Sequence, residues 1–343
     1  METRPLPLTV TLEKNEALLL TPSDAPAPEV TEKTRLRLRF DKAAADFGNN
    51  FLTMDTLRWS EDGEHFSAPM LCGELTQLLL KRRYDGKLWL RYEFEIEKKP
   101  EKMLLLMEKA EGVHRVNGKV ISFDRSLPEE PCVLIADISP FLREGDNRFE
   151  TELHWHQSED TYYALFGEDV TENMLHCIVY DSEIEAVYLA GHFGVRSHAN
   201  FAPYDGEYLL GHSFYITSVP ETVSEPVTDG LPFFRGDLTL TQKVKLTETD
   251  LLLELPGDYL TAKVYVNDQY AGEFCYNGTL DISKFTVLGE NTFRVTFTIG
   301  NRNLLGPFHA QLDESFVAPE LFEACDLPAG PNGEPRYKFH CFY

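Results

Sequence analysis

The sequence lacks the residue patterns of metal-binding, disulfide-bonded and membrane-spanning proteins. Its six cysteines are scattered along 343 residues, with no CxxC pair and no Cys/His spacing of the kind that zinc requires. No stretch approaches the roughly 18 consecutive apolar residues of a membrane span, and the N-terminus lacks the apolar core of a signal peptide. These absences predict buried, reduced thiols, no metal centre and a cytoplasmic protein.

Positive charge is also scarce. The chain has 56 Asp and Glu residues against 32 Lys and Arg, which gives a formal net charge of -24. Such a chain repels phosphate backbones and anionic lipid surfaces, so we expect neither nucleic acid nor a membrane as a partner. We attribute the net negative charge to a role in keeping the protein soluble.

Helical patterns are rare. Only Ser67 to Tyr84, and Asp313 to Glu323 with Pro319 inside it, could form one or two helical turns. A (β/α)₈ barrel needs eight amphipathic helices, and this sequence does not contain them. GxSxG, HExxH, GxxxxGK and dinucleotide-binding motifs are absent as well, and among 56 acids no catalytic pair can be preferred.

Alternation of apolar and polar residues dominates the chain. A period of two residues is typical of half-buried strands, and the Gly, Asn, Asp and Pro residues between the segments are typical of turns. The pattern therefore predicts an all-β fold of antiparallel sandwiches. The alternating segments are Arg35 to Phe40, Leu88 to Ile96, Phe149 to Trp155, Leu238 to Val244, Ala262 to Val266 and Thr292 to Ile299.

Three phrases occur twice in the same order. The first copy consists of Val116-Asn117-Gly118, then Asp137-Ile138-Ser139-Pro140-Phe141, and then a Gly-containing turn with Asn147. The second copy consists of Val266-Asn267-Asp268, then Asp281-Ile282-Ser283-Lys284-Phe285, and then a Gly-containing turn with Asn291. Asn-Gly and Asn-Asp favour hairpin turns because both turn residues must accept positive φ. The Ile and Phe of the second phrase are expected in the core, and its Asp and Ser are expected to hydrogen-bond to local backbone groups. The repeat predicts a duplicated β-sandwich, in which these residues are structural.

The repeated pattern resembles the galactose-binding-like jelly roll, the sugar-binding domain found in glycoside hydrolases of the family 2 and rhamnosidase-like kind. Further phrases resemble the C-terminal ancillary half of large bacterial glycoside-hydrolase-like proteins. These are Arg82 to Leu90, Val187 to Gly194, Gly230 to Gly236 and Arg302 to His309. In those proteins a catalytic barrel precedes this region, and nothing of that pattern precedes it here. The resemblance therefore implies binding without catalysis.

The resemblance implies two tandem galactose-binding-like β-sandwich (jelly-roll) domains with an N-terminal β segment. We expect residues 1–84 to pack on the first sandwich, residues 85–225 to form that sandwich, and residues 226–343 to form the second sandwich with a C-terminal tail. Composition makes Val219 to Gly230 the clearest linker. The aromatic end, Phe339 to Tyr343, is expected to dock on a domain.

Two clusters are candidate sugar-binding sites. His154 and His156 would share one face of a strand with Trp155 on the other, so they could hold a metal or a sugar; alternatively, Trp155 is core and the histidines are a surface pair. Arg302, Asn303 and His309 follow the last strand of the second sandwich and offer donors that suit sugar hydroxyls, although a structural role is equally open. No cofactor is expected, but Asp55, Asp62, Asp137 and Asp281 could give oxygens to a structural Ca²⁺.

The sequence thus predicts a carbohydrate-associated binding or ancillary module of a glycoside-hydrolase-like protein, without a catalytic domain of its own. Its partner would be a carbohydrate or a catalytic glycoside-hydrolase domain. One alternative is a glycan-cleaving enzyme with a site between the sandwiches. In such a site two carboxylates, or a His or Tyr with Arg, would converge with shifted pKa values. Another is a structural scaffold for a partner domain or a homo-oligomer, which would expose a large apolar patch.

Overall fold

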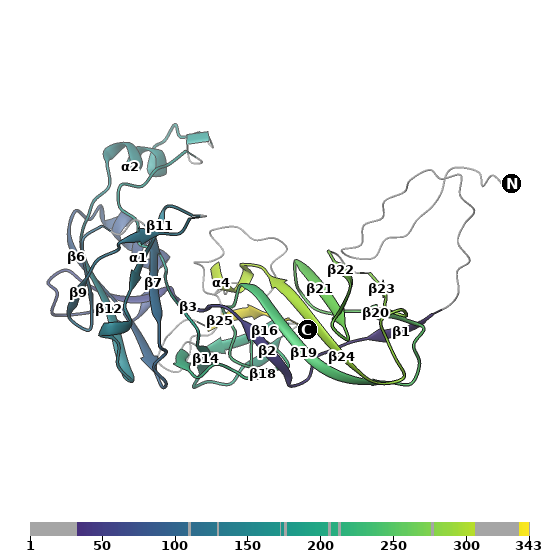
Figure 1. Ribbon diagram of the computed structural model, residues 1–343. Coiled ribbons are helices and arrows are strands. Elements are labelled where there is room, and N and C mark those ends of the chain that lie inside the picture. Colours follow the sequence, from purple (N-terminus) through teal and green to yellow (C-terminus); the bar gives the residue numbers. More distant parts are fainter. Residues whose placement is uncertain are drawn as a thin grey trace, which may run out of the picture.

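The protein is described from a computed structural model covering residues 33–108, 111–128, 130–171, 173–174, 177–204, 207–211, 214–275, 278–305 and 336–342. These residues form many strands and few short helices, which confirms the all-β fold class. The strands gather in two bodies that lie end to end (Figure 1). Within the described part of the chain, no helix is long and apolar enough to cross a membrane.

The first sandwich packs a five-stranded sheet against an eight-stranded sheet. Alternate residues of its long strands are buried and meet in one core, which contains Tyr92, Phe149 and Trp155. The first sheet has the order β10 (Arg125–Ser126), β11 (Val133–Asp137), β7 (Met103–Glu108), β13 (Val187–Gly191), β3 (Asn50–Met54). The second has the order β14 (Gly194–Ser197), β17 (Phe214–Thr217), β6 (Gly86–Ile96), β12 (Gly145–Trp155), β8 (Val113–Val116), β9 (Lys119–Ile121), with β4 (Thr56–Ser60) on β6 and β5 (Met70–Leu71) on β4.

One helix supports the first core. The sequence allowed one or two turns within Ser67 to Tyr84, and α1 (Cys72–Arg82) forms there. Glu74 accepts a hydrogen bond from the backbone N–H of Leu71, which caps the start of the helix, and Leu75 and Leu79 are fully buried one turn apart. Further helices with bounds among the described residues are η1 (Ser139–Phe141), α2 (Glu159–Phe166) and α4 (Arg302–Leu305). The expected helix at 313–323 lies outside the described residues.

The second sandwich packs a six-stranded sheet against a three-stranded sheet around a separate core. The larger sheet has the order β18 (Thr222–Val223), β2 (Ala43–Phe47), β19 (Gly236–Leu246), β24 (Gly289–Ile299), β21 (Thr261–Val266), β22 (Gln269–Phe274). The smaller sheet has the order β1 (Thr34–Arg37), β20 (Leu251–Glu254), β23 (Leu280–Asp281).

The N-terminal segment is divided between the two sandwiches. β1 pairs in parallel with β20, and β2 pairs antiparallel with β19, so both strands complete the second sandwich. β3 pairs with β13 and β4 with β6, so the chain crosses into the first sandwich near residue 50. The expectation that the whole segment packs on the first sandwich is therefore wrong for residues 34–47. Alternation predicts strands, but it does not say which distant strand each one joins.

The predicted linker at residues 219–230 is packed rather than free. Val223 lies in the core of the second sandwich, whereas Val227 lies in the core of the first. Just beyond it, Phe233 enters the first core and Phe234 the second. The segment does connect the sandwiches, but its apolar residues are fixed in both of them.

The aromatic C-terminal segment docks as expected. β25 (Arg336–His340) joins β16 (Glu207–Gly211) and β15 (Ala202–Tyr204) in a third, small sheet. Tyr337 and Phe339 are buried in the first core, and Phe342 is buried in the second. The Tyr337 hydroxyl donates to Oδ1 of Asp55 at 2.7 Å. The segment therefore binds both sandwiches.

The two sandwiches repeat one plan. β6 and β12 form an 11-residue antiparallel pair that begins with Gly145 opposite Ile96, and β19 and β24 form another that begins with Gly289 opposite Leu246. Between these strands β7, β8, β9 and β11 match β20, β21, β22 and β23 in order. The repeated phrases of the sequence therefore mark a repeated structure.

The repeated asparagines hold equivalent turns. Asn117 and Asn267 have φ values of 50° and 51°, a left-handed conformation that asparagine tolerates better than most residues. Asn117 donates to the carbonyl of Phe141 at 2.9 Å, and Asn267 donates to the carbonyl of Phe285 at 2.9 Å. As the repeat predicts, these residues fix turns.

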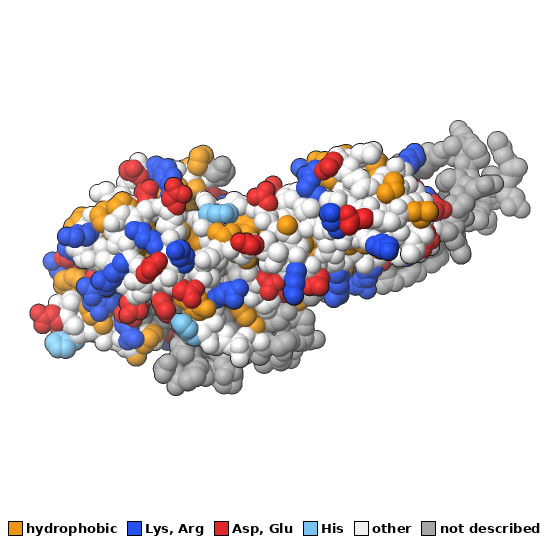
Figure 2. Space-filling model, turned by 60° about the horizontal axis from the view of Figure 1, so that its bottom comes forward, with side chains coloured by type: hydrophobic (Ala, Val, Ile, Leu, Met, Phe, Trp, Pro, Cys, Tyr) orange, Lys and Arg blue, Asp and Glu red, His pale blue; other side chains and the backbone are white. Residues whose placement is uncertain are grey.

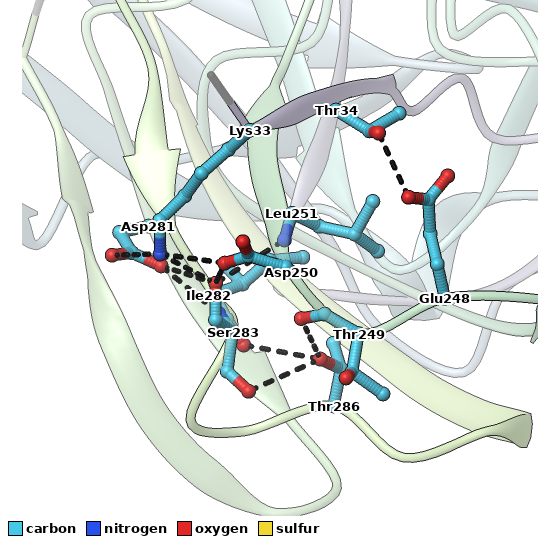
Figure 3. Close-up of polar contacts among 10 residues, drawn as sticks. All are labelled: Lys33, Thr34, Glu248, Thr249, Asp250, Leu251, Asp281, Ile282, Ser283 and Thr286. Carbon is cyan, nitrogen blue, oxygen red and sulfur yellow. Dashed lines mark hydrogen bonds and ion pairs between the residues drawn. The ribbon is translucent and has the colours of Figure 1, made fainter. Parts of the chain in front are cut away.

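The Asp-Ile-Ser phrases are also equivalent, but the second one has an added cation (Figure 3). Ser283 donates to Asp281 and accepts from the backbone N–H of Leu251, as Ser139 does with Asp137 and Met103. Lys33, just before β1, lies 2.8 Å from Asp281 and 2.9 Å from Asp250. These ion pairs anchor β1 beside β20.

The surface carries both signs of charge. On the face drawn in Figure 2, acidic and basic side chains are interspersed over both sandwiches. Cross-strand ion pairs also occur in the first sandwich, as between Arg91 and Glu150 at 2.9 Å. Recognition on this face would therefore depend on local groups rather than on a field of one sign.

Candidate functional site

The residues of the His154 cluster do not form one site, because successive side chains of β12 point to opposite faces of the sheet. Trp155 has no exposed surface and packs in the first core, so its indole offers no face to a sugar. This corrects its assignment to a sugar-binding face and favours the alternative of a core tryptophan with two surface histidines. His154 lies 2.8 Å from Asp85, and the rings of His154 and His156 lie 5.9 Å apart.

The second predicted cluster does line a cavity. Arg302 and Asn303, in the short helix α4, border a pocket of about 230 Å³ at the end of the second sandwich. We call it the C-terminal pocket. The third residue of the cluster, His309, lies outside the described residues. The pocket is also lined by Phe234, Asp258, Tyr259, Leu260, His340 and Phe342.

A hydrogen-bonded frame holds the C-terminal segment against this pocket. Asn303 donates to the carbonyl of His340 at 2.8 Å, and its side-chain oxygen accepts from the His340 N–H at 2.9 Å. Because both ends of the amide are used in this way, Asn303 positions the segment and has little capacity left for a ligand. The structural alternative therefore describes Asn303 better than the binding one.

The charged groups of the pocket gather around Asp258. Its carboxylate lies 2.9 Å from Nε2 of His340, and its backbone N–H donates to the carbonyl of Phe342 at 2.8 Å. The hydrogen bond from His340, with a smaller contribution from the Arg302 charge, lowers the pKa of Asp258. The carboxylate is therefore ionised at neutral pH and accepts hydrogen bonds.

An aromatic wall closes the other side. Tyr259 packs against Phe297 and Phe342, with ring centroids 5.3 and 6.5 Å away. Burial raises the pKa of Tyr259 to about 12, and its hydroxyl donates to the carbonyl of Leu255 at 2.9 Å. Tyr259 is therefore a neutral phenol with its proton engaged, and it can serve as an apolar surface but not as a general base.

The pocket is better equipped to bind than to hydrolyse. Glycosidases place two carboxyl groups about 5 to 10 Å apart across the scissile bond. Asp258 is the one carboxylate among the described residues that line this pocket. Arginine, imidazole and carboxylate groups beside aromatic rings are, in contrast, a set that can meet the hydroxyls and C–H faces of a sugar.

Sequence reasoning missed the partners that the fold supplies. Asp258 lies in the turn after β20 and His340 lies more than 80 residues later, so no local pattern joins them. The one available signal was the aromatic C-terminus, which predicted docking but not its position. The four aspartates proposed for Ca²⁺ are not brought together, and within the described ranges no three His, Cys, Asp or Glu side chains could hold a metal.

Comparisons with known proteins give only distant likenesses. No protein-family model and no curated protein matches the chain. Among solved structures, β-D-mannosidase from Dictyoglomus thermophilum is 12% identical over 73% of this chain and 31% of its own, with a TM-score of 0.28. An uncultured Clostridium sp. β-glucuronidase is 12% identical over 77% and 44%, with a TM-score of 0.29. The Ruminococcus gnavus β-glucuronidase is 12% identical over 80% and 45%, with a TM-score of 0.30.

These proteins are longer than the present chain, which spans between about a third and a half of each. Likeness at such scores and identities does not establish a shared ligand or activity. The function must therefore be argued from the residues of the chain itself.

Proposed function

We propose that the chain is a carbohydrate-binding, ancillary module of a glycoside-hydrolase-like protein, built from two galactose-binding-like jelly rolls. The observation that carries this proposal is the C-terminal pocket, which is lined by Arg302, Asp258 and His340 together with aromatic rings. Its 230 Å³ is below the roughly 300–1,000 Å³ of pockets for drug-sized ligands, which suits a single sugar unit. Oligosaccharides would therefore bind by one residue, for example at a chain end.

Binding is favoured over catalysis by the groups that the pocket presents. The enzyme alternative requires a second carboxylate, or a His or Tyr beside the arginine. Among the described lining residues there is no second carboxylate, Tyr259 has its proton engaged, and Nε2 of His340 already contacts Asp258 at 2.9 Å. The proposed protein partner is a catalytic domain of a glycoside-hydrolase-like protein, which would cleave the glycan that this module binds.

A glycan array followed by calorimetry tests the proposal. Arg302→Ala should weaken binding of the selected glycan about tenfold or more, because one charge-assisted donor is lost. Arg294→Ala is the matched control, since Arg294, on β24, lies over the ring of Tyr265, on β21, and does not line the pocket. The control should bind like the wild type.

Two results would contradict the proposal. If no glycan binds the wild-type protein, the module does not recognise carbohydrate. If the wild type hydrolyses aryl glycosides and Asp258→Asn abolishes this turnover, the enzyme alternative replaces the binding one. Loss of binding in both arginine variants would remove the pocket from the proposal.

A further inference from the structure

A second cavity lies in the first sandwich and takes no part in the site described above. It has a volume of about 590 Å³ and opens where β6 and β12 meet the Asn117 turn, with β17 along one side. We call it the corner cavity. The described residues that carry its chemistry are Glu93, Glu95, Arg143, Asp146, Arg148 and Phe214.

The duplication supplies an internal reference for this cavity. The second sandwich has the same turn, because Asn291 bonds to Asn267 and to the N–H of Val287 as Asn147 bonds to Asn117 and to the N–H of Arg143. The backbone frame is therefore the same in both copies. In the order Glu93, Glu95, Arg143, Asp146, Arg148, the second copy has Lys243, Lys245, Val287, Glu290, Thr292.

The fold does not require the charges of the corner cavity. Two acids of the first copy are lysines in the second, and two arginines are replaced by valine and threonine, yet both turns keep their hydrogen bonds. β17 is a further difference, since it pairs with β6 at Glu95 and Ile96, whereas among the described strands β19 pairs with β2 and β24 alone. The first sandwich thus has an added strand, β17, and a set of charged side chains that the turn shared by the two sandwiches does not require.

One pairing in the cavity is unfavourable for stability. Glu95 of β6 lies directly opposite Asp146 of β12, and like charges in this position destabilise a sheet. The second copy places Lys245 opposite Glu290, which is the stabilising combination. A pair that opposes stability at the mouth of a cavity is typical of a site kept for binding.

The balance of charge identifies the class of ligand. Glu93 is ion-paired with Arg58 at 3.0 Å and Arg148 with Glu150 at 3.2 Å, whereas Glu95 contacts Nε2 of His198 at 2.8 Å, an imidazole that is a cation only when protonated. The Arg143 guanidinium donates from Nε to the backbone carbonyl of Asp146 at 3.0 Å and keeps its other N–H groups for a ligand, and the carboxylate of Asp146 lies outside these pairs. A charged ligand of either sign would meet its own charge, whereas a neutral ligand with many hydroxyls can accept from the first and donate to the second.

We infer that the corner cavity is a second carbohydrate site, which takes a neutral oligosaccharide rather than a single sugar. Its volume is within the range of pockets for larger ligands, and Phe214 and Phe94 add apolar surface at its floor. The inference rests on the proposed carbohydrate-binding function but concerns a different site, which lies in the first sandwich. With the C-terminal pocket it would make the module bivalent, so avidity for long glycans would exceed that of either site.

The test replaces residues of the first copy by those that the second copy already uses. The variant Glu95→Lys/Arg143→Val/Arg148→Thr should fold, because the equivalent frame accepts these residues. Its melting temperature should change little, because removal of the like-charge pair offsets the loss of the exposed contacts of Glu95 with His198 and of Arg148 with Glu150. Calorimetry with neutral oligosaccharides selected on the array should show affinity about tenfold weaker or more. The reverse variant, Lys245→Glu/Val287→Arg/Thr292→Arg, is the matched control and should bind like the wild type.

The outcomes separate the two sites. Binding that survives Arg302→Ala but is lost in the triple variant supports the inference. If Arg302→Ala removes all glycan binding and the triple variant leaves it unchanged, the corner cavity is not a site, while the proposed function stands. If the triple variant instead loses affinity for a lysine-rich or acidic peptide and not for sugars, the inference is overturned.

Discussion

Asn267 donates from its side-chain nitrogen to the side-chain oxygen of Asn291 at 2.9 Å, and Asn117 makes the same bond to Asn147 at 2.8 Å. In both copies the second asparagine is buried and also bonds to two carbonyls of its own turn. These pairs join the hairpin of each sandwich to the start of its last long strand.

Removing one of these asparagines should destabilise its sandwich strongly. Asn291→Ala leaves the Val287 N–H and the Asn267 amide without their acceptor, and we expect a loss of about 3 kcal/mol in the free energy of unfolding. Urea unfolding followed by circular dichroism measures it. Asn200→Ala, at an exposed position, should change stability by less than about 0.5 kcal/mol. Equal effects of the two substitutions would show that the network is unimportant.

Trp155 should matter for stability and not for ligand binding. Its indole is fully buried in the first core, so Trp155→Ala should cost about 3–5 kcal/mol, and Trp155→Phe clearly less. Thermal unfolding gives the first quantity, and calorimetry with a bound glycan, at a temperature where the variant is folded, gives the second. Weaker binding by the folded Phe variant would return Trp155 to the list of ligand contacts.

The cysteines should differ sharply in reactivity. Burial raises the pKa of the Cys72 thiol well above its usual value, so little thiolate forms and reagents cannot reach it. Cys132, Cys177 and Cys275 are exposed. Brief treatment of the native protein with iodoacetamide should label these three and leave Cys72 unlabelled until denaturant is added, as peptide mass spectrometry can report. Early labelling of Cys72 would mean that α1 opens readily.

The Lys33 ion pairs should give the N-terminal strand a dependence on acid pH. Hydrogen bonding to Lys33, followed by that to Ser283, lowers the pKa of Asp281 from 3.8 to about 2. Because the folded pKa lies below the unfolded one, this stabilisation is complete above about pH 4 and is lost as the pH falls toward 2. In Lys33→Met, NMR titration should find the carboxyl pKa moved back toward 3.8. An unchanged pKa would show that the ion pair does not form in solution.

Local features of the fold could be predicted from the sequence. The Asn turns and the Asp-Ile-Ser phrases are specified by residues that are close in sequence and by conformations that few residue types adopt, so reading them needs no tertiary information. The same holds for the alternating strands, whereas for α1 the pattern indicated only one or two turns and the helix has 11 residues. Period two also places His154 and Trp155 on opposite faces, but it does not say which face is inside, which is why the tryptophan was open to two interpretations.

Long-range choices could not be predicted. β1 and β2 join the second sandwich because their hydrogen-bonding edges meet β20 and β19, more than 190 residues away. Asp258 meets His340 for a similar reason, and this contact builds the C-terminal pocket. Such pairings are selected by the packing of the whole chain, and no local pattern in the sequence reveals them.

The segment from Val223 to Phe234 has a mechanical consequence. Its apolar side chains enter both cores in turn, so neither sandwich can rotate against the other without withdrawing residues such as Val227 or Phe233 from a packed interior. A joint of this kind has no hinge. The direction in which one cavity faces relative to the other is set when the chain folds, and a glycan that reaches both must match that fixed geometry.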